Sequence, residues 1–516
     1  MIKILNNNKH LFFSLLLAIH VLTIASCSKE DSNTTDYDAI EGGTVAIDES
    51  AYTSGTAEGT TETGYDEEDI LANSTFSKTV AIAFGSAVTV TNPYAGSGVT
   101  VTYSGQDVVV NSTISEVEYV LSGTATDGSI KIYSDKKFKL NLNGVSITNA
   151  DGPAINIQSS KRVFVVLADN TSNSLTDGAT YAAAVNGEDQ KATFFSEGQL
   201  IFSGTGTLNV AGKYKHAICS DDYVRVIGGT INITEAASDG IHTNDAFIAD
   251  GGTFNIAASS DGIEVEEGFV IINDGLFAIN VVDDAITASY EEGDASIDPY
   301  VVINGGDFTI NTTEGEGIES KSHMTINNGT IYAKTADDAL NAGTALYING
   351  GKIFTYSTGN DAIDSNGIIT ITGGMTIAVG SRSPEGGFDC DGNTFKITGG
   401  FALGLGGSTS GPTASVSTVR SVITGGVSAN QIVHIEDASG NEVLTFLNPT
   451  SFSTMLFASS KMKASTQYNI YVGGSVSDAT DFNGIYTAGT YTRGTVAANF
   501  TTSNMVTQIG GSVSRM

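Results

Sequence analysis

Hydrophobic and polar residues alternate along most of this chain, and glycines interrupt the alternation at regular intervals. Segments such as VRVIGGTINIT (224–234) and YVVINGGDFTIN (300–311) are examples. An alternation with a period of two is typical of β-strands, and helical periodicity is almost absent. The pattern therefore predicts an all-β protein in which a glycine turn separates each strand from the next.

Two sets of residues recur with the same period. The glycine of each turn falls at Gly229, Gly252, Gly275, Gly306, Gly329, Gly351, Gly374 and Gly400. An apolar residue after a second turn falls at Ile218, Ile241, Ile263, Ile286, Ile318, Leu340, Ile363 and Phe388. Most steps in both series are 22 or 23 residues. We call the second series the apolar markers.

A unit of 22–23 residues with three short strands and three turns predicts a right-handed parallel β-helix. A leucine-rich repeat would need its leucine ladder and a helical half, and a propeller would need about 40 residues per blade. Rungs should stack about 4.8 Å apart, with inward Ile, Val and Phe in columns and the turn glycines at positive φ. We place the β-helix at residues 76–405 and a small β-rich module at residues 406–516.

Acidic residues keep the same register as the apolar markers. The phrase SDGI occurs at 238–241 and again at 260–263, and an acid stands two residues before the marker in six consecutive rungs. In a β-helix these acids would form a vertical column. Neighbouring carboxylates about 4.8 Å apart repel by roughly 0.9 kcal/mol in water and about 3.5 kcal/mol at an effective dielectric of 20.

Calcium is the counter-charge that this column favours, because calcium takes six to eight oxygen ligands with flexible geometry. Magnesium fits less well, and the six histidines are scattered along the chain with no zinc-type spacing. The alternative is that the acids only stabilise turns by bonding to nearby backbone amides. The predicted metal ligands are Asp222, Asp239, Asp245, Asp261, Glu264, Asp284, Glu316, Asp338, Asp361 and Asp364.

Composition narrows the partners. The formal net charge of −33 argues against nucleic acid as a ligand. Cys219 and Cys390 would lie seven rungs apart, too far for a disulfide, so both are expected to be free thiols in or near the core.

The N-terminus reads as an export signal. Lys3 and Lys9 precede an apolar run from Leu11 to Ile24, and Ile-Ala-Ser-Cys ends at Cys27. This resembles a bacterial lipobox, which implies that residues 1–27 are a lipoprotein signal peptide and that Cys27 is lipidated. Residues 28–75 hold 13 acids and one lysine, so we expect a disordered acidic tether. The Ser-Lys-Glu-Asp sequence at 28–31 resembles the acidic tag that exports some Gram-negative lipoproteins to the outer face. The resemblance implies a surface lipoprotein of the outer membrane, held there only by its lipid anchor.

The order of these motifs carries a family resemblance. LNLNGVSITNADGPAI (140–155), HAICSDDYVRVIGGTINI (216–233), SDGIHTNDAFIADGGTFNI (238–256) and the tail YNIYVGGS…GTYTRGT resemble extracellular carbohydrate-binding β-helix proteins with a pectate-lyase-like coil. The resemblance spans about residues 95–510. It implies calcium binding and binding of cellulose or an acidic polysaccharide such as polygalacturonate, without cleavage. An insertion at 288–300 departs from the pattern.

Three functions remain open. The first is polysaccharide binding through calcium, with Tyr290, Tyr300, Tyr332 and Tyr347 as candidate sugar-stacking residues; the absence of Trp argues against a flat platform for crystalline cellulose. The second is a polysaccharide lyase, which would need a lysine or arginine base beside the metal. The candidate bases are Lys213, Lys215, Lys321, Lys334 and Arg382. The third is an adhesin or surface scaffold, because a β-helix alone decides nothing among these functions.

Overall fold

A computed structural model describes residues 43–48, 52–290 and 296–514, all within one compact unit that spans Gly42–Met516. The predicted signal peptide, Cys27 and the first part of the predicted tether lie outside these residues. Almost all regular structure is β-strand, joined by three short 3-10 helices, η2 (Glu67–Asp69), η3 (Leu71–Asn73) and η4 (Val185–Gly187). Within the described part of the chain, no helix has the length and hydropathy needed to span a membrane.

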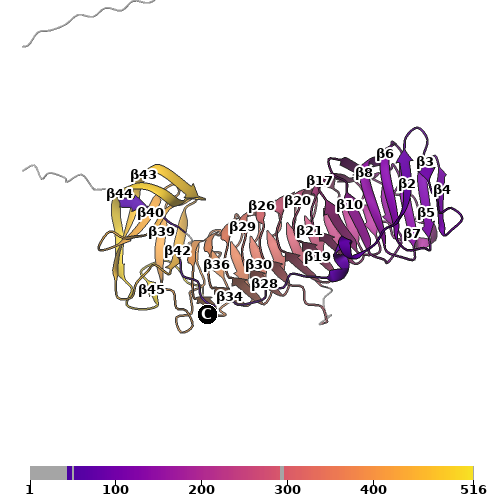
Figure 1. The fold of residues 1–516 in the computed structure, drawn as a ribbon. Helices are drawn as coiled ribbons and strands as arrows, with labels where there is room; N and C mark the ends of the chain where they lie inside the picture. The colour runs from indigo at the N-terminus through magenta and orange to yellow at the C-terminus, as the bar shows by residue number, and fades with distance from the viewer. Residues whose placement is uncertain (1–42, 49–51, 291–295, 515–516) are drawn as a thin grey trace, which may run out of the picture. The chain divides into compact units, whose positions relative to one another are not determined.

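The strands stack in three parallel columns, which confirms the predicted parallel β-helix (Figure 1). We call the columns sheets I, II and III. Sheet III contains the apolar markers, sheet I contains the next strand of each rung, and sheet II contains the strand after the glycine turn. Sheet I contains β10 (Val163–Leu167), β13 (Leu200–Gly204), β16 (Tyr223–Val226), β19 (Ala246–Ala249), β22 (Phe269–Ile272), β25 (Val301–Ile303), β28 (His323–Ile326), β31 (Ala345–Ile348), β34 (Ile368–Ile371) and β37 (Phe395–Ile397).

Sheet II follows the glycine turn. It contains β11 (Ser172–Thr176), β14 (Thr207–Gly212), β17 (Thr230–Ala236), β20 (Thr253–Ala258), β23 (Leu276–Val281), β26 (Asp307–Thr312), β29 (Thr330–Thr335), β32 (Lys352–Ser357), β35 (Met375–Val379) and β38 (Phe401–Gly406). At the N-terminal end, β2 (Lys78–Phe84), β3 (Thr89–Thr91), β6 (Val117–Ala125) and β8 (Phe138–Thr148) extend these two sheets. The long strand β8 pairs with β10 by its first half and with β11 by its second.

Sheet III carries the apolar markers. It contains β4 (Val99–Ser104), β5 (Gln106–Ser112), β7 (Gly128–Ser134), β9 (Ile155–Ile157), β12 (Ala192–Ser196), β15 (His216–Ser220), β18 (Ile241–Thr243), β21 (Ile263–Val265), β24 (Ile286–Ala288), β27 (Ile318–Ser320), β30 (Leu340–Ala342), β33 (Ile363–Ser365) and β36 (Phe388–Asp389). Each marker pairs directly with the marker of the next rung, as Ile241 does with Ile263. The sequence register is therefore the structural register.

The core and the turns match the sequence expectations. The markers are fully buried, and burying one isoleucine side chain stabilises the fold by about 1.5–3 kcal/mol. Phe254, Phe277 and Phe308 stack from rung to rung with ring centroids 4.5 and 4.7 Å apart. All eight marker glycines have positive φ, where a Cβ would be strained. Cys219 and Cys390 are both buried and free, as predicted.

A C-terminal β region adjoins the last rung (Figure 1). Strand β42 (Phe452–Ser459) pairs antiparallel with β38 and with β39 (Ser421–Val427), which also pairs with β45 (Val506–Gln508). A second, five-stranded sheet is formed by β1 (Gly43–Val45), β40 (Ile432–Asp437), β41 (Glu442–Leu447), β43 (Gln467–Phe482) and β44 (Ile485–Thr501). Because β42 pairs with β38, the last strand of sheet II has no open edge at this end of the coil.

Residues 52–76 run back along the β-helix as a strap, although the sequence predicts a disordered tether over 28–75. The strap starts near the C-terminal region, where the Tyr52 ring meets Phe401 edge-on at 5.5 Å. It ends at the N-terminal rungs, where Phe76 packs against Phe164. In Figure 1 the strap is the indigo segment that follows the coil. A composition rule misses it because the partners that order it lie hundreds of residues away.

Those partners are a column of side-chain amides beside the glycine turns, which we call the asparagine ladder. It consists of Asn273, Asn304, Asn327 and Asn349. Each Nδ2 donates one hydrogen bond to a strap carbonyl, with lengths of 2.8–2.9 Å to Thr63, Glu62, Thr60 and Glu58. It donates a second bond of 2.8–2.9 Å to the side-chain oxygen one rung earlier.

Arginines hold the acidic end of the strap. Arg162, whose side chain is 11% exposed, lies 3.0 Å from Asp66, 2.6 Å from Glu68 and 2.8 Å from Asp69. Arg225 lies 3.3 Å from Asp69 and donates to the carbonyl of Gly64 at 2.5 Å. The acids that indicate self-repulsion in the sequence are therefore paired with coil arginines.

Candidate functional site

The acidic register of the sequence becomes two adjacent columns along sheet III, which together we call the acidic ladder. The turn column stands two residues before each marker and comprises His216, Asp239, Asp261, Asp284, Glu316, Asp338 and Asp361. The strand column stands one residue after each marker and comprises Cys219, His242, Glu264, Thr287, Glu319, Asn341, Asp364 and Asp389. Successive strand residues face opposite sides, so the strand column points away from the core that the markers fill.

One oxygen of several turn-column carboxylates is used by the backbone. Oδ1 of Asp261 accepts a hydrogen bond of 2.9 Å from the amide of Asp284, and Oδ1 of Asp284 accepts one of 2.7 Å from the amide of Glu316. Asp239, Asp338 and Asp361 accept in the same way from the next rung. The turn-stabilising interpretation is therefore correct for one oxygen of these groups.

Burial leaves the remaining charge poorly solvated. The exposed fraction is 2% for Asp239, 9% for Asp261 and Asp284, 5% for Asp338 and 7% for Asp361. Desolvation disfavours the charged carboxylate, and neighbouring carboxylates add to the effect. When no cation balances them, burial raises the pKa of Asp261 to about 8, of Asp284 to about 10 and of Asp338 to about 9.

The strand column shows the same effect nearer to the surface. Burial and the Asp389 carboxylate raise the pKa of Asp364 to about 7, and burial raises that of Glu264. In the neighbouring turn column, burial likewise raises the pKa of Asp361 to about 8. A carboxyl group with such a pKa is either protonated at neutral pH or balanced by a cation, and perturbed groups of this kind concentrate at functional sites.

Three groups of carboxylates place oxygen atoms within 4.8 Å of one another: Asp239, Asp261 and Glu264; Asp261, Asp283 and Asp284; and Asp361, Asp364 and Asp389. These donor sets are entirely oxygen, which suits a hard cation such as calcium. An ionised carboxylate cannot donate a hydrogen bond to its neighbour as an amide can, so the carboxylates of a group cannot neutralise one another.

The ten predicted metal ligands are divided by the fold. Asp239, Asp261, Glu264, Asp284, Asp361 and Asp364 join the three groups, whereas Glu316 and Asp338 stand in the turn column outside them. Asp222 and Asp245 are not on the ladder. They lie near each other at the turn after sheet III, where Asp222 accepts a hydrogen bond from Gln199 and Asp245 is exposed.

A fourth group of possible ligands consists of His216, Asp239 and His242. Sequence reasoning missed four residues of these four groups. Asp283 and Asp389 were not among the predicted ligands, and both join a carboxylate group. The histidines looked scattered, yet His216 and His242 meet at the N-terminal end of the ladder. Their register held the signal, because His216 stands two residues before its marker and His242 one residue after its own.

The four predicted sugar-stacking tyrosines do not form one platform. Tyr290 is 37% exposed beside sheet III, and Tyr332 lies on sheet II, stacked on Phe354 at 5.3 Å. Tyr300 stacks between Phe269 and His323 beside sheet I and donates a hydrogen bond of 2.8 Å to Glu62 of the strap. Tyr347 lies on sheet I, half-buried, with its ring against Gly59 of the strap. The four rings therefore belong to three faces of the coil.

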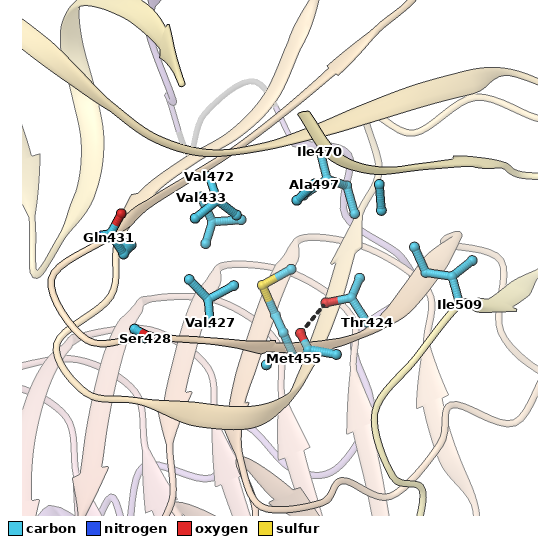
Figure 2. A pocket seen from close by; sticks show the side chains of 13 residues that line it. Thr424, Val427, Ser428, Gln431, Val433, Met455, Ile470, Val472, Ala497 and Ile509 are labelled. Carbon is cyan, nitrogen blue, oxygen red and sulfur yellow. Dashed lines mark hydrogen bonds between the residues drawn. The ribbon is translucent and has the colours of Figure 1, made fainter. Parts of the chain in front are cut away.

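The C-terminal region contains an apolar cavity of about 560 Å³ between β42 and the five-stranded sheet (Figure 2). Met455, Val433, Val472 and Ile470 point into it. None of its 13 lining residues is charged or aromatic. Sugar recognition needs placed polar groups as well as apolar contact, so this cavity is a weaker candidate site than the acidic ladder.

Comparison with known proteins agrees with the family suggested by the sequence. The model of the family of carbohydrate-binding domain-containing proteins matches residues 95–387, more than half of the chain, so the chain belongs to that family. The match contains sheet III from β4 to the residue before marker Phe388, and hence nearly the whole acidic ladder.

Individual relatives match over shorter stretches. A carbohydrate-binding domain-containing protein of Acetivibrio thermocellus is 34% identical over 119 residues, which are 22% of this chain and 41% of the relative. The chain thus spans about two fifths of that relative's length. A solved structure, described as a polysaccharide lyase-like protein from C. thermocellum in a gadolinium derivative, is 25% identical with a TM-score of 0.39. It covers 53% of this chain and 99% of its own.

Proposed function

We propose that this chain is a cell-surface lipoprotein that binds an acidic polysaccharide through calcium ions on the acidic ladder and does not cleave it. The observation that carries the proposal is the ladder itself, a run of carboxylates of which four buried ones, Asp261, Asp284, Asp338 and Asp361, have raised pKa values, beside a partly exposed second column. The carbohydrate-binding family of the chain supports a polysaccharide as the ligand.

The two columns would have different roles in binding calcium. The turn column is buried and hydrogen-bonded to the backbone, so its free oxygens would bind the ion from the inner side. The strand column at Asp364 and Asp389 is half-buried, so a cation there keeps coordination positions open to solvent. A uronate carboxylate could occupy those positions. Calcium takes six to eight oxygens, more than the three carboxylates of the group Asp361, Asp364 and Asp389 supply as single ligands.

A polysaccharide lyase is the competing function, and Lys321 is the observation that keeps it in view. Of the five predicted basic residues, Lys321 forms an ion pair with the ladder residue Glu319. That contact raises the pKa of Lys321 against the opposing effect of burial. A general base needs a pKa lowered toward neutral pH, so the Glu319 contact favours a structural role for Lys321 and favours binding over elimination.

A binding assay with matched variants tests the proposal. The full chain is titrated with polygalacturonate in millimolar calcium and again in chelator, alongside Asp361→Asn/Asp364→Asn and a control, Asp274→Asn/Asp307→Asn. The control removes the same two charges from exposed residues beside the glycine turns. We expect calcium-dependent binding by the native chain and the control, and a loss of at least about tenfold in the ladder variant.

The same samples separate the alternatives. A calcium-dependent rise in ultraviolet absorbance from unsaturated uronate would establish lyase activity and overturn the non-catalytic part of the proposal. No binding to acidic or neutral glycans would favour the surface scaffold. For the anchor, Cys27→Ala should release the protein from the membrane fraction, and normal anchoring of that variant would reject the lipoprotein assignment.

A further inference from the structure

The N-terminal end of the acidic ladder differs chemically from the rest of it. Here the carboxylates give way to two histidines: His216 in the turn column and His242 in the strand column. Between them stands Asp239, and Glu264 follows His242 one rung later. The four side chains come from three successive rungs, so no short sequence motif announces them.

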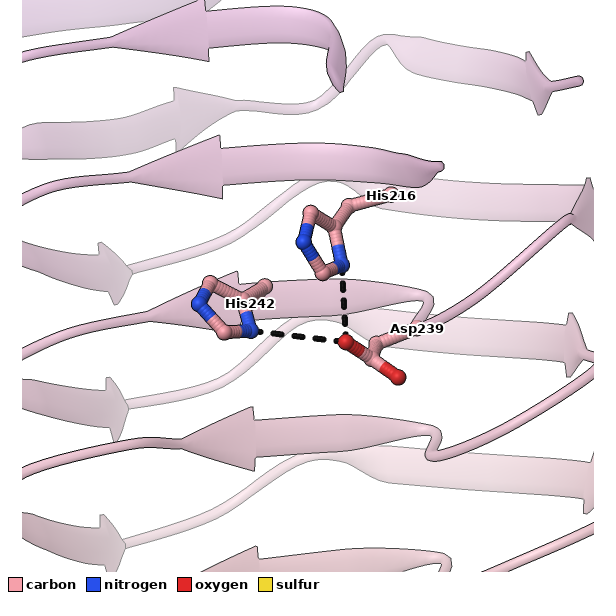
Figure 3. Close-up of side chains that lie close together, drawn as sticks. All are labelled: His216, Asp239 and His242. Atoms are coloured by element: carbon pink, nitrogen blue, oxygen red, sulfur yellow. Dashed lines mark ion pairs between the residues drawn. The ribbon is translucent and has the colours of Figure 1, made fainter. Parts of the chain in front are cut away.

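The ligand atoms of His216, Asp239 and His242 lie within 4.8 Å of one another, and Glu264 contacts His242. The two imidazole rings stack with centroids 4.1 Å apart and an interplanar angle of 22°, which turns both Nδ1 atoms toward Asp239 (Figure 3). Oδ2 of Asp239 lies 2.7 Å from Nδ1 of His216 and 3.4 Å from Nδ1 of His242. Oε2 of Glu264 lies 2.8 Å from Nδ1 of His242. The other Asp239 oxygen faces away, toward the amide of Asp261.

His216 lacks the bonding that a buried histidine normally has. It is 1% exposed, and neither ring nitrogen has a hydrogen-bond partner of acceptable geometry among the described residues. Oδ2 of Asp239 thus lies close to Nδ1 of His216, but the two atoms do not form a well-aligned hydrogen bond. Leaving a buried polar group unsatisfied costs about 1–3 kcal/mol, so a native site of this kind calls for a ligand.

The spacing of the ligand atoms suits a small tetrahedral cation. Ligands at 2.0–2.1 Å in a tetrahedron stand about 3.3 Å apart. The Asp239–His242 separation of 3.4 Å matches this value, and the two shorter contacts, 2.7 and 2.8 Å, would have to open by about half an ångström around an ion. Imidazole nitrogen is a preferred ligand of zinc, cobalt and similar transition metals, whereas calcium takes oxygen. One ligand atom each of His216, Asp239 and His242 lies within 4.8 Å of the other two, as in the carboxylate groups.

We propose that His216, Asp239 and His242 bind one zinc-class divalent cation at the N-terminal end of the acidic ladder, with Glu264 as the fourth ligand once its carboxylate turns toward the ion. This ion would take Asp239 and Glu264 from the first carboxylate group and leave the rest of the ladder to calcium. The site is largely enclosed, because Glu264 is the most exposed of the four side chains and is only 25% exposed. A site that is filled by four protein ligands is structural rather than catalytic. The ion would tie three rungs together at the place where the ladder begins. The proposal does not depend on glycan binding.

The test uses the full chain without a histidine tag, stripped of metal and then supplied with millimolar calcium. Cobalt(II) is titrated first as a spectroscopic probe, and zinc is added to displace it. We expect one equivalent of cobalt, a visible absorption band of tetrahedral nitrogen and oxygen ligation, and loss of that band when zinc binds. Absence of a bound equivalent under saturating calcium would overturn the proposal.

Variants assign the ligands. His216→Gln and His242→Gln should each weaken zinc binding by at least about tenfold, whereas His323→Gln, on the same coil but beside Tyr300, should not. Unchanged zinc affinity in both His216→Gln and His242→Gln would place the metal elsewhere. If either variant fails to fold, X-ray absorption at the zinc edge of the native chain decides the matter. Two imidazole nitrogens are expected, and a shell of oxygen alone would contradict the site.

Discussion

The β-helix carries two polar ladders built on the same rung spacing, and they solve the problem of stacking polar side chains in different ways. At the glycine turns, Asn273, Asn304, Asn327 and Asn349 pass hydrogen bonds from rung to rung. Along sheet III the corresponding positions are aspartate and glutamate. An amide both donates and accepts, so an asparagine ladder satisfies itself, whereas an ionised carboxylate only accepts. An ionised acidic ladder therefore needs protons or positive charge to balance it, and calcium is the partner that we propose.

The two ladders also differ in what covers them. The asparagine ladder has a partner in the chain itself, because the second hydrogen of each amide bonds to a carbonyl of the strap. The acidic ladder has partners for one oxygen of its turn-column carboxylates and a half-buried outer column. The strap thus closes one edge of the coil, and we propose that the other edge binds cations and their ligands.

The largest expected effect comes from supplying or removing calcium. An ion that binds only the folded chain stabilises it by about 2.7 kcal/mol per site at a concentration a hundredfold above Kd. With more than one carboxylate group on the ladder, the native chain should melt well below its calcium-loaded Tm when chelator is present, and magnesium should substitute poorly. Calorimetric melting curves in calcium, magnesium and chelator measure this. Identical curves would mean that the acidic ladder needs no cation.

Making the asparagine ladder resemble the acidic one should come next in size. Asn327→Asp removes the hydrogen bonds to Thr60 and Asn304 and buries a charge among acceptors. We expect a loss of about 2–4 kcal/mol at pH 7, reduced at pH 4 where the new carboxyl becomes protonated. The control is Asn255→Asp, on an exposed asparagine row of sheet II, where water solvates the charge. Equal losses in the two variants would show that the strap contacts contribute little.

The pH dependence of the chelated protein follows from the raised pKa values. Asp261 and Asp361 have a pKa of about 8 in the fold and an ordinary value near 4 when unfolded, so between these values the folded chain holds more protons. The contribution of these two groups to stability therefore falls as the pH rises from 5 to 8. His242, with a pKa raised to about 9 by its carboxylate neighbours despite burial, acts in the same direction. Burial lowers the pKa of His216 to about 4, so His216 opposes this trend below about pH 6.5, but it is one group against several. The Tm in chelator should drop by a few degrees over this range, and calcium should flatten the slope.

The smallest effect concerns the end of the strap. Arg162→Gln removes the ion pairs to Asp66, Glu68 and Asp69. Because Asp66 and Glu68 are partly exposed, we expect only about 1–2 kcal/mol, felt as local opening of the strap. Limited proteolysis should cut the variant within residues 52–76 faster than the native chain, with Arg382→Gln as the exposed control. Equal cleavage rates would assign the ordering of the strap to the asparagine ladder alone.

Much of this architecture could be predicted from local sequence. The apolar markers and turn glycines recur every 22–23 residues, and a parallel coil repeats its side-chain environment at that interval, so Ile241 and Ile263 had to share a column. The same logic placed Asp239, Asp261 and Asp284 together. It could also have found His216 and His242, whose place in the register identifies them despite a separation of 26 residues in sequence.

Other features were beyond this reasoning for physical reasons. The strap has the composition of a disordered segment, and it is ordered by Asn349, Asn327 and Arg162, which lie far away in sequence. Asp222 and Asp245 are acids close to the markers, but they lie beyond the end of the sheet III strand, in the turn that leads to sheet I. Tyr300 and Tyr347 looked available to sugars because sequence alone does not show that the strap packs against them.

Calcium titration of a converted ladder tests the central claim most directly. Asp261→Asn/Asp284→Asn turns two acidic rungs into amide rungs while leaving the histidine cluster in place. By isothermal titration calorimetry at pH 7.5 on metal-free protein, we predict that the native chain binds calcium and that this variant binds at least one equivalent fewer. In chelator the variant should also melt no lower than the native chain, because repulsion is relieved. If the variant binds as many calcium ions as the native chain with unchanged affinity, the acidic ladder is not the cation site.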